Sequence, residues 1–171
     1  MAPAFGSAYP PLFVRAVTRV LANEGGHASL PGDPGGETNF GISHRAYPDL
    51  DLAGLTRDGA VAIYFRDFWK AGRYHELPDS IAVKLFDLAV NMGPAHAVRC
   101  LQRALRACGR LVVEDSALGN TTVSSANRVD GGALLAALRS EAAGYYRATA
   151  ASKPGDGESG FFEGWLNRAY Q

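Results

Sequence analysis

Residues 80–92 read SIAVKLFDLAVNM, and this stretch decides the fold. Its apolar residues fall on nearly every side of a helix, which is typical of a helix buried in the middle of a domain. Gly93-Pro94 follows directly and breaks the helical pattern. We therefore expect residues 80–92 to form a central helix on which the rest of the chain packs.

Amphipathic patterns surround this central helix. Leu12–Glu24 carries apolar residues at the i, i+3, i+4, i+7 and i+8 positions of one helical face. Residues 27–48 are instead rich in Gly, Pro, Asp and Asn, and short strands flanking the Asp33–Gly36 turn are expected there. Further helices are expected after Thr56, over 95–107 and 121–127, after Asp130 and from Phe161. The sequence thus predicts a mainly α fold with a small irregular or β-containing insertion after the first helix.

Composition and hydropathy disfavour several classes of function. Lys plus Arg and Asp plus Glu balance at 17 each, which disfavours a nucleic-acid partner. No apolar run is long enough to cross a bilayer, and residues 1–11 lack the charged and apolar regions of a secretory signal. We expect a protein without stable membrane insertion, made without such a signal.

The cysteines and histidines indicate neither a disulfide nor a metal site. Cys100 and Cys108 fall on one expected helix, about 12 Å apart at 1.5 Å per residue, beyond the reach of a disulfide. The four histidines show no paired metal-ligand spacing and no Cys partner. We expect no metal and no cofactor.

Glu24 stands out among the carboxylates. It follows Val17 by seven residues and Val20 by four, so it continues the apolar stripe of the first helix. It also lies at the C-terminal end of that helix, where the macrodipole disfavours a negative charge. Both effects raise the expected pKa of Glu24, as a general acid near neutral pH requires. Position alone favours a solvated residue at a helix end.

A second carboxylate and a hydroxyl follow at short intervals, Asp33 and Thr38. Cleavage of a glycosidic bond needs a protonated carboxyl for the leaving oxygen and commonly a second group that orients water or stabilises positive charge on the sugar. The Gly-rich turn can bring that second group back toward the helix end. Alternatively, Asp33 only begins a turn and Thr38 only favours a strand.

The motif that holds these residues resembles a known family. Glu24-Gly25-Gly26, then D-P-G-G-x-T-x-x-G-I-S over residues 33–43, is followed by Tyr64, Trp69 and the helix ending at 91–93. This pattern is similar to the N-acetylmuramidases of glycoside hydrolase family 108, which include phage endolysins and bacterial wall hydrolases with a lysozyme-like fold. The resemblance implies that Glu24 is the catalytic acid.

The resemblance extends into the second half, where residues 115–122, 133–138 and 161–167 are similar to the predicted peptidoglycan-binding portion of these enzymes. It implies a catalytic portion over residues 1–92 and a binding portion over 93–171, packed together as one compact unit. The spacing of Glu24, Asp33 and Thr38 also resembles the Glu–Asp–Thr arrangement of phage-type lysozymes, with the threonine one residue nearer here.

Four further side chains are candidates for substrate binding. Asp87 and Asn91 stand at i, i+4 in the central helix, where a polar group is costly unless it is hydrogen-bonded. They either line the cleft or clamp the helix to a neighbouring segment. Tyr64 and Trp69 either stack on sugar rings or belong to the core.

A stripe of arginines follows the central helix, on the outer face of the next one. It comprises Arg99, Arg103, Arg106 and Arg110. The stripe either binds an anionic wall polymer or phospholipid, or is a solvated helix face.

The function that the resemblance implies is that of a monomeric, endolysin-like N-acetylmuramidase. It would cut the β-1,4 bond between MurNAc and GlcNAc in bacterial peptidoglycan, as in phage lysis. It would be made in the host cytoplasm and reach the wall through a separate pore-forming or export system. Two alternatives remain open: a lytic transglycosylase that yields anhydro-muropeptides, and a non-catalytic wall-binding protein.

Overall fold

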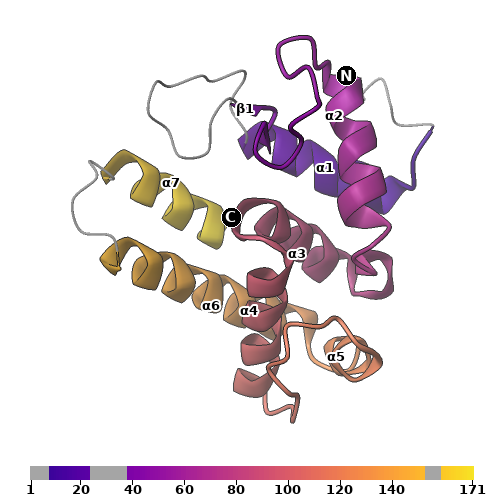
Figure 1. Ribbon diagram of the computed structural model, residues 1–171. Helices are drawn as coiled ribbons and strands as arrows, with labels where there is room; N and C mark the ends of the chain where they lie inside the picture. The colour runs from indigo at the N-terminus through magenta and orange to yellow at the C-terminus, as the bar shows by residue number, and fades with distance from the viewer. Residues whose placement is uncertain (1–7, 24–37, 153–158) are drawn as a thin grey trace.

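The computed structural model describes residues 8–23, 38–152 and 159–171, and in these ranges the protein is mainly helical (Figure 1). The elements are α1 (Pro11–Asn23), β1 (Thr38–Asn39), β2 (Ile42–Ser43), α2 (Arg57–Ile63), the π-helical η1 (Tyr64–Trp69), the 3₁₀ turn η2 (Tyr74–Glu76), α3 (Asp79–Met92), α4 (Pro94–Ala107), α5 (Asn120–Ala126), α6 (Gly131–Ala151) and α7 (Ser159–Tyr170). The predicted fold class, a mainly α protein with a small β-containing insertion after the first helix, is confirmed.

Helix α3 lies at the centre of the fold, between α1 on one side and α4 and α6 on the other (Figure 1). Its apolar residues are almost fully covered, with exposed fractions of at most 1% for Ile81, Ala82, Leu85, Phe86, Leu88 and Ala89. The burial of all sides explains why residues 80–92 are apolar nearly throughout. The prediction of a central helix is confirmed.

Helices α1 and α3 run parallel to each other. Arg15 of α1 pairs with Asp79 at the start of α3, and Asn23 Nδ2 donates to Asp87 Oδ1 over 3.2 Å. Both contacts join residues whose numbers differ by 64. Because this offset is the same at both ends, the C-terminal ends of the two helices point in the same direction.

An aromatic cluster fixes η1 against these two helices. The ring of Phe13 lies 4.9 Å from that of Phe65, 5.4 Å from Trp69 and 6.0 Å from Phe86. Trp69 also meets Phe86 edge-on at 5.3 Å. Such tilted and edge-to-face pairs add to the stabilisation from burial alone, so the cluster holds α1, η1 and α3 in one arrangement.

The β-containing insertion is a two-stranded hairpin. Strand β1 pairs with β2 in antiparallel register, with Thr38 opposite Ser43. Its two-residue turn is Phe40-Gly41, with φ of 51° and 76°, because a tight hairpin turn of this type needs positive φ at both positions. Both strands come after residues 33–36, the expected turn that the strands were predicted to flank, and residues 24–37 lie outside the described residues.

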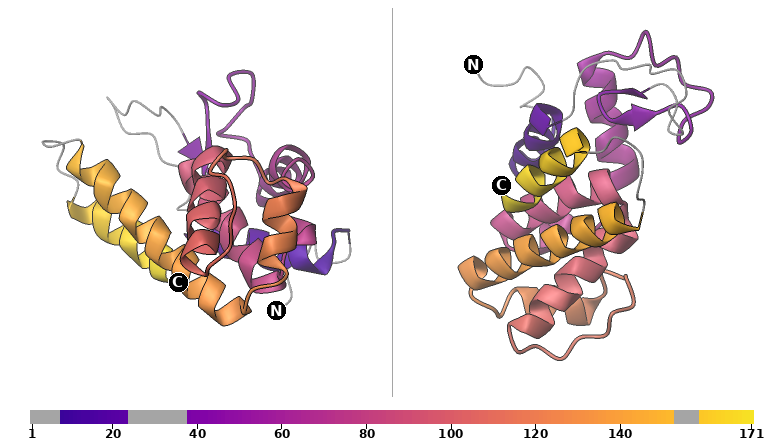
Figure 2. Two further views of the ribbon diagram at one scale, coloured as in Figure 1. Left: turned by 90° about the horizontal axis from the view of Figure 1, so that it is seen from below. Right: turned by 90° about the vertical axis from the view of Figure 1, so that its left-hand side faces the viewer.

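The second half of the chain packs as a helical layer on α3. Figure 2 shows α6 and α7 side by side, and the rings of Tyr146 and Trp165 stack between them at 5.7 Å. Asp130 caps α6 as expected, accepting from the backbone N–H of Ala133 over 2.8 Å. Since α3 contacts both α4 and α6, the elements before and after Gly93 share one core.

Two further observations concern the described residues as a whole. Cys100 and Cys108 are both free thiols, as their spacing predicts. None of the helices in the ranges given above is long and apolar enough to cross a membrane.

Candidate functional site

Asp87 is the most enclosed of the candidate site residues that the structure describes. Its side chain is 0% exposed, and its Oδ1 accepts from Arg168 Nε over 3.0 Å and from Asn23 Nδ2 over 3.2 Å. The carboxylate therefore joins α3 to the ends of α1 and α7. These contacts correspond to the internal clamp, the alternative that the sequence left open for this residue.

The clamp determines where the chain leaves α1. Asn23 is the last residue of α1, and Glu24 is bonded to it. Glu24 and Asp33 themselves lie outside the described residues, so their roles stay predictions. What the structure describes is the platform that precedes them, an α1 terminus hydrogen-bonded to the middle of the central helix.

Asn91 lies one helical turn beyond Asp87, at the exposed end of α3. Its Oδ1 accepts a hydrogen bond of 2.7 Å from the hydroxyl of Tyr146, on α6. This bond fixes the orientation of the amide, because the Tyr146 hydroxyl occupies the oxygen side. Among the described residues no partner is recorded for the Asn91 NH₂ group, which remains able to donate.

The hairpin that carries Thr38 is held from two sides. Tyr64 donates its hydroxyl to the carbonyl of Phe40 over 2.8 Å, and Asn39 Nδ2 donates to the carbonyl of Leu52 over 2.8 Å. Within the parts of the chain that the structure describes, the Thr38 hydroxyl forms no recorded hydrogen bond. Figure 1 shows the hairpin on the side of the molecule where α1 ends.

Tyr64 and Trp69 both lie in the core. They are 1% and 3% exposed, and the Trp69 ring stacks on Tyr74 at 5.6 Å. Burial therefore favours the core alternative over stacking on sugars for both rings. Tyr64 reaches the hairpin through its hydroxyl and is a positioning residue for the strand that carries Thr38.

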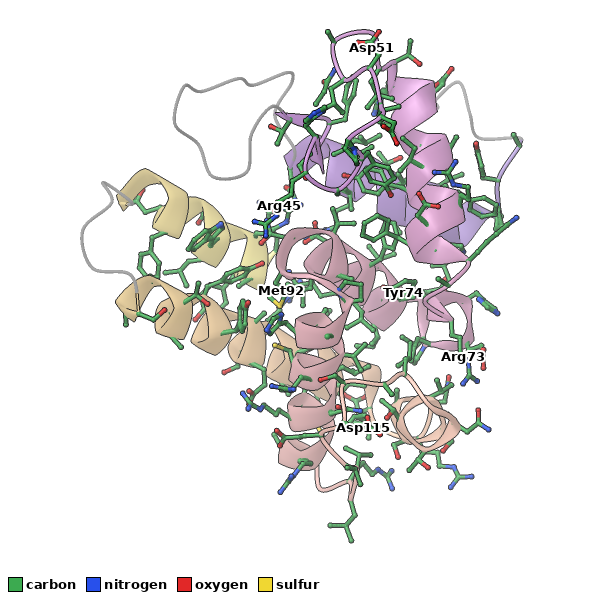
Figure 3. The ribbon with its side chains drawn as sticks, in the orientation of Figure 1. Arg45, Asp51, Arg73, Tyr74, Met92 and Asp115 are labelled. Atoms are coloured by element: carbon green, nitrogen blue, oxygen red, sulfur yellow. The ribbon has the colours of Figure 1, made fainter. Side chains whose placement is uncertain are left out.

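Figure 3 shows Arg45, which follows β2, on the same side of the molecule as Met92, the last residue of α3. Sequence reasoning missed three residues whose hydrogen bonds hold the end of α1, the hairpin and Asn91 in place. They are Asn23, Asn39 and Tyr146. Asn23 stands next to the E-G-G motif, which was the one available signal. The other two act through contacts with residues 13 and 55 positions away, and no local pattern reveals these.

The arginine stripe of α4 is bound to its own chain. Arg103 and Arg106 both reach Glu114, at 2.9 Å and 3.1 Å. Arg99 donates to the Ser116 hydroxyl, and Arg110 donates to the carbonyl of Arg128. The stripe thus fastens the irregular connection between α4 and α5, a use that the sequence did not anticipate.

Comparisons with known proteins agree with this architecture. Residues 17–93 match the family model described as "Glycosyl hydrolase 108", and residues 96–170 match the one described as "Predicted Peptidoglycan domain". Among solved structures, the chain is similar to SagA of Brucella abortus, with 26% identity and a TM-score of 0.72 over 92% of this chain and 93% of that one. Comparison with curated proteins gave no match.

These matches define the class of protein: a glycoside hydrolase that acts on peptidoglycan. More particularly, the part of the chain from within α1 to the end of α3 is similar to glycosyl hydrolase 108. The part from α4 to the end of α7 is similar to the predicted peptidoglycan domain. The family resemblance seen in the sequence is confirmed.

Proposed function

We propose that this protein is an endolysin-like N-acetylmuramidase that hydrolyses the β-1,4 bond between MurNAc and GlcNAc, with Glu24 as the general acid. The observation that carries the proposal is the match of residues 17–93 to the glycosyl hydrolase 108 model, within which Glu24 directly follows the clamped end of α1. A glycosidase needs a carboxyl held in one position beside the scissile bond.

The anchoring of Asn23 supports this role for Glu24. Adjacent Cα atoms are 3.8 Å apart, so the hydrogen bond from Asn23 to Asp87 limits where the next residue can lie. The C-terminal end of a helix disfavours a carboxylate relative to a neutral carboxyl. A protonated Glu24 can then donate to the oxygen of the leaving sugar.

Asp33 and Thr38 complete the proposed chemistry on the opposite side of the bond. We propose that they position the attacking water or stabilise the positive charge that develops on the sugar ring. The Thr38 hydroxyl has no recorded hydrogen bond within the described ranges, and the hairpin that carries it is fixed by Tyr64 and Asn39. Both features suit a hydroxyl that must bind water.

Asn91 is the best-supported substrate-binding residue. Its amide is exposed at the end of α3, and Tyr146 holds the oxygen side. The NH₂ group can therefore donate to an oxygen of the glycan without first breaking an internal hydrogen bond. We propose that it contacts the sugar beside the cleaved bond.

The test compares two carboxyl groups within the same motif, those of Glu24 and Glu37. Glu24→Gln is expected to abolish the release of muropeptides from purified sacculi, while Glu37→Gln retains wild-type release, because the motif leaves position 37 open. Circular dichroism checks that both variants fold. A Glu24→Gln protein that lyses sacculi at the wild-type rate would refute the proposal.

The products separate hydrolysis from transglycosylation. Hydrolysis leaves a reducing sugar, whereas a lytic transglycosylase leaves an anhydro sugar that is lighter by one water. Mass spectrometry of the released muropeptides is expected to show the reducing form. Anhydro products throughout would assign the protein to the transglycosylases.

We also propose that the enzyme, a monomer, acts at the wall after leaving the cytoplasm through a separate pore-forming or export system, as in phage lysis. Cells that make it alone are expected to keep growing, and cells that also make a pore-forming protein are expected to lyse. Lysis without the pore would contradict this route.

A further inference from the structure

A pocket of about 230 Å³ lies where α1, α3, α6 and the residue after α7 meet. It is lined by Arg15, Arg19, Asp79, Ser80, Val83, Lys84, Leu135, Arg139 and Gln171. Four of these side chains are basic and one is acidic, and that acid, Asp79, pairs with Arg15. Beyond Arg15, which Asp79 balances, and Arg139, which donates to the end of Gln171, the pocket is lined by the basic side chains of Arg19 and Lys84.

Two of these basic groups have buried nitrogens without partners. Nε of Arg19 and Nε of Arg139 are both shielded from solvent and form no hydrogen bond in the described part of the chain. Another nitrogen of Arg139 donates to the terminal oxygen of Gln171, the last residue of the sequence. A buried donor without an acceptor is costly, and such groups in a native protein call for an explanation such as an unoccupied ligand position.

Lys84 adds a third positive charge that is not fully balanced. It is 3% exposed, donates to the carbonyl of Arg168, and lies 3.9 Å from Asp87 Oδ2. Asp87 Oδ1 also accepts from Arg168. Burial, and then the charges of Arg19, Arg139 and Arg168, lower the pKa of Lys84 to about 8.

We propose that this pocket binds a carboxylate group of the peptide stem of peptidoglycan. The proposal rests on the proposed function, because it assumes that the glycan strand lies beside the end of α1. Arginine is suited to this role, since its planar guanidinium donates two parallel hydrogen bonds to a carboxylate. A bound anion would supply acceptors to Arg19 and Arg139 and balance the charge beside Lys84.

The size and walls of the pocket favour the end of a peptide over a sugar chain. Its volume is below the range of about 300–1,000 Å³ that holds most small-molecule ligands, so it accommodates a single terminal group. Val83 and Leu135 supply apolar walls next to the cations, which suits the methyl group of an alanine beside its carboxylate.

The position of the pocket fits a ligand that both domains hold. Lys84 belongs to the glycosyl hydrolase 108 region and Arg139 to the peptidoglycan domain. Arg19 precedes Asn23 by four residues, so the two share one face of α1 about 6 Å apart along its axis. An extended peptide covers about 3.3 Å per residue, so a stem of a few residues spans that distance.

The experiment uses the stem tetrapeptide L-Ala-γ-D-Glu-diaminopimelate-D-Ala without any sugar, titrated into the full-length protein by calorimetry. We expect measurable binding of the free peptide and at least tenfold weaker binding when its carboxylates are amidated. Arg19→Gln and Arg139→Gln are each expected to weaken binding at least tenfold. Arg103→Gln, on α4, is the matched control and is expected to leave the affinity unchanged.

Equal affinity for the free and amidated peptides, or for the wild type and both pocket variants, would overturn the proposal. Inorganic phosphate is titrated in parallel. If phosphate binds in an Arg139-dependent way and the peptide does not, the assignment to a stem carboxylate is overturned. Thermal melts of each variant show that lost binding does not reflect unfolding.

The outcomes separate this proposal from the muramidase proposal, because the peptide contains no glycosidic bond. If Glu24→Gln stops cleavage while the wild type does not bind the peptide, only the pocket assignment is refuted. If the peptide binds but sacculi release no muropeptides, only the proposed cleavage is refuted.

Discussion

Two groups of basic side chains differ sharply in how their charge is balanced. Arg103 and Arg106 of α4 share the half-buried carboxylate of Glu114, Arg99 donates to Ser116, and Arg110 donates to the carbonyl of Arg128 after α5. Between α1, α3 and α6, the cations Arg19, Lys84 and Arg139 face one another, with Asp87 as the nearest acid to Lys84. The members of the first group are regularly spaced in the sequence, and each has a recorded hydrogen-bond acceptor. The members of the second group are scattered in the sequence, and Nε of Arg19 and of Arg139 has no hydrogen-bond partner in the described residues.

The comparison shows that the density of arginines along a helix is a poor guide to a binding surface. What matters is whether each donor already has an acceptor, and how far water can screen the charge. By this criterion the α4 stripe is a fastener for residues 110–119. We call the group formed by Arg19, Lys84 and Arg139 the buried seam. It is the place where an external anion would gain most binding free energy.

The largest expected effect comes from removing the acid of the seam. Asp87→Ala removes the recorded ion-pair partner of the buried Lys84 and one of the partners of Arg168, and breaking a buried pair costs about 3–5 kcal/mol. Urea unfolding followed by circular dichroism measures the change. A loss below about 1 kcal/mol would mean that water reaches the seam and the charges there are not truly buried.

A second effect depends on pH. Because the pKa of Lys84 falls from 10.5 to about 8 on folding, the unfolded chain binds more protons than the folded one between these values. The free energy of unfolding of the wild type should therefore rise relative to Lys84→Met from pH 8 to 10.5, by up to about 3 kcal/mol. Below pH 8 the difference should be constant, since Lys84 is charged in both states.

Denaturation curves of the two proteins at intervals of half a pH unit provide the measurement. Their difference removes the titration of the tyrosines, whose pKa values are also shifted at Tyr47, Tyr74 and Tyr146. A difference that does not vary between pH 8 and 10.5 would show that the charge of Lys84 is compensated in the folded protein.

A third prediction concerns the excess cations. Arg19→Met removes a buried donor without a partner and one of the charges facing Lys84, so we expect the ligand-free protein to gain about 1 kcal/mol of stability. Thermal melts in a chloride buffer without phosphate or carboxylates test this. Arg103→Met is the control, and a gain in both variants would point to a general effect of lower positive charge.

The smallest effect is expected at the α4 stripe. Glu114→Gln weakens its ion pairs with Arg103 and Arg106, but exposed pairs contribute little, so the melting temperature should fall by less than about 4 °C. The difference should shrink further in high salt, because exposed charges are screened. A fall comparable to that of Asp87→Ala would contradict the contrast between the two regions.

Local patterns predicted most of the helices. The apolar spacing of residues 13–20, the all-round apolar surface of α3, and the caps Thr56 and Asp130 each depend on neighbours within a few positions. The parallel register of α1 and α3 is seen in contacts 64 residues apart, and η1 contacts these helices through Trp69, whose ring meets Phe13 and Phe86. Neither has a local signature.

For the candidate site, the sequence predicts more than the structure tests. The motif around Glu24 predicts a glycoside hydrolase, which the match to glycosyl hydrolase 108 supports, while the roles of Glu24, Asp33 and Thr38 stay predictions. The position of Asp87 and Asn91 in the central helix indicated that both need hydrogen-bond partners. It did not indicate which, because the partners Arg168 and Tyr146 belong to α7 and α6. The basic seam was missed because its members come from three separate helices.

The most direct test of the central claim is digestion of purified sacculi in water enriched in ¹⁸O, with mass spectrometry of the muropeptides. If the protein is a muramidase, each newly released MurNAc end will carry one ¹⁸O atom, and Glu24→Gln will release none. Anhydro-MurNAc ends without the label, or labelled ends from Glu24→Gln at the wild-type rate, would contradict the account.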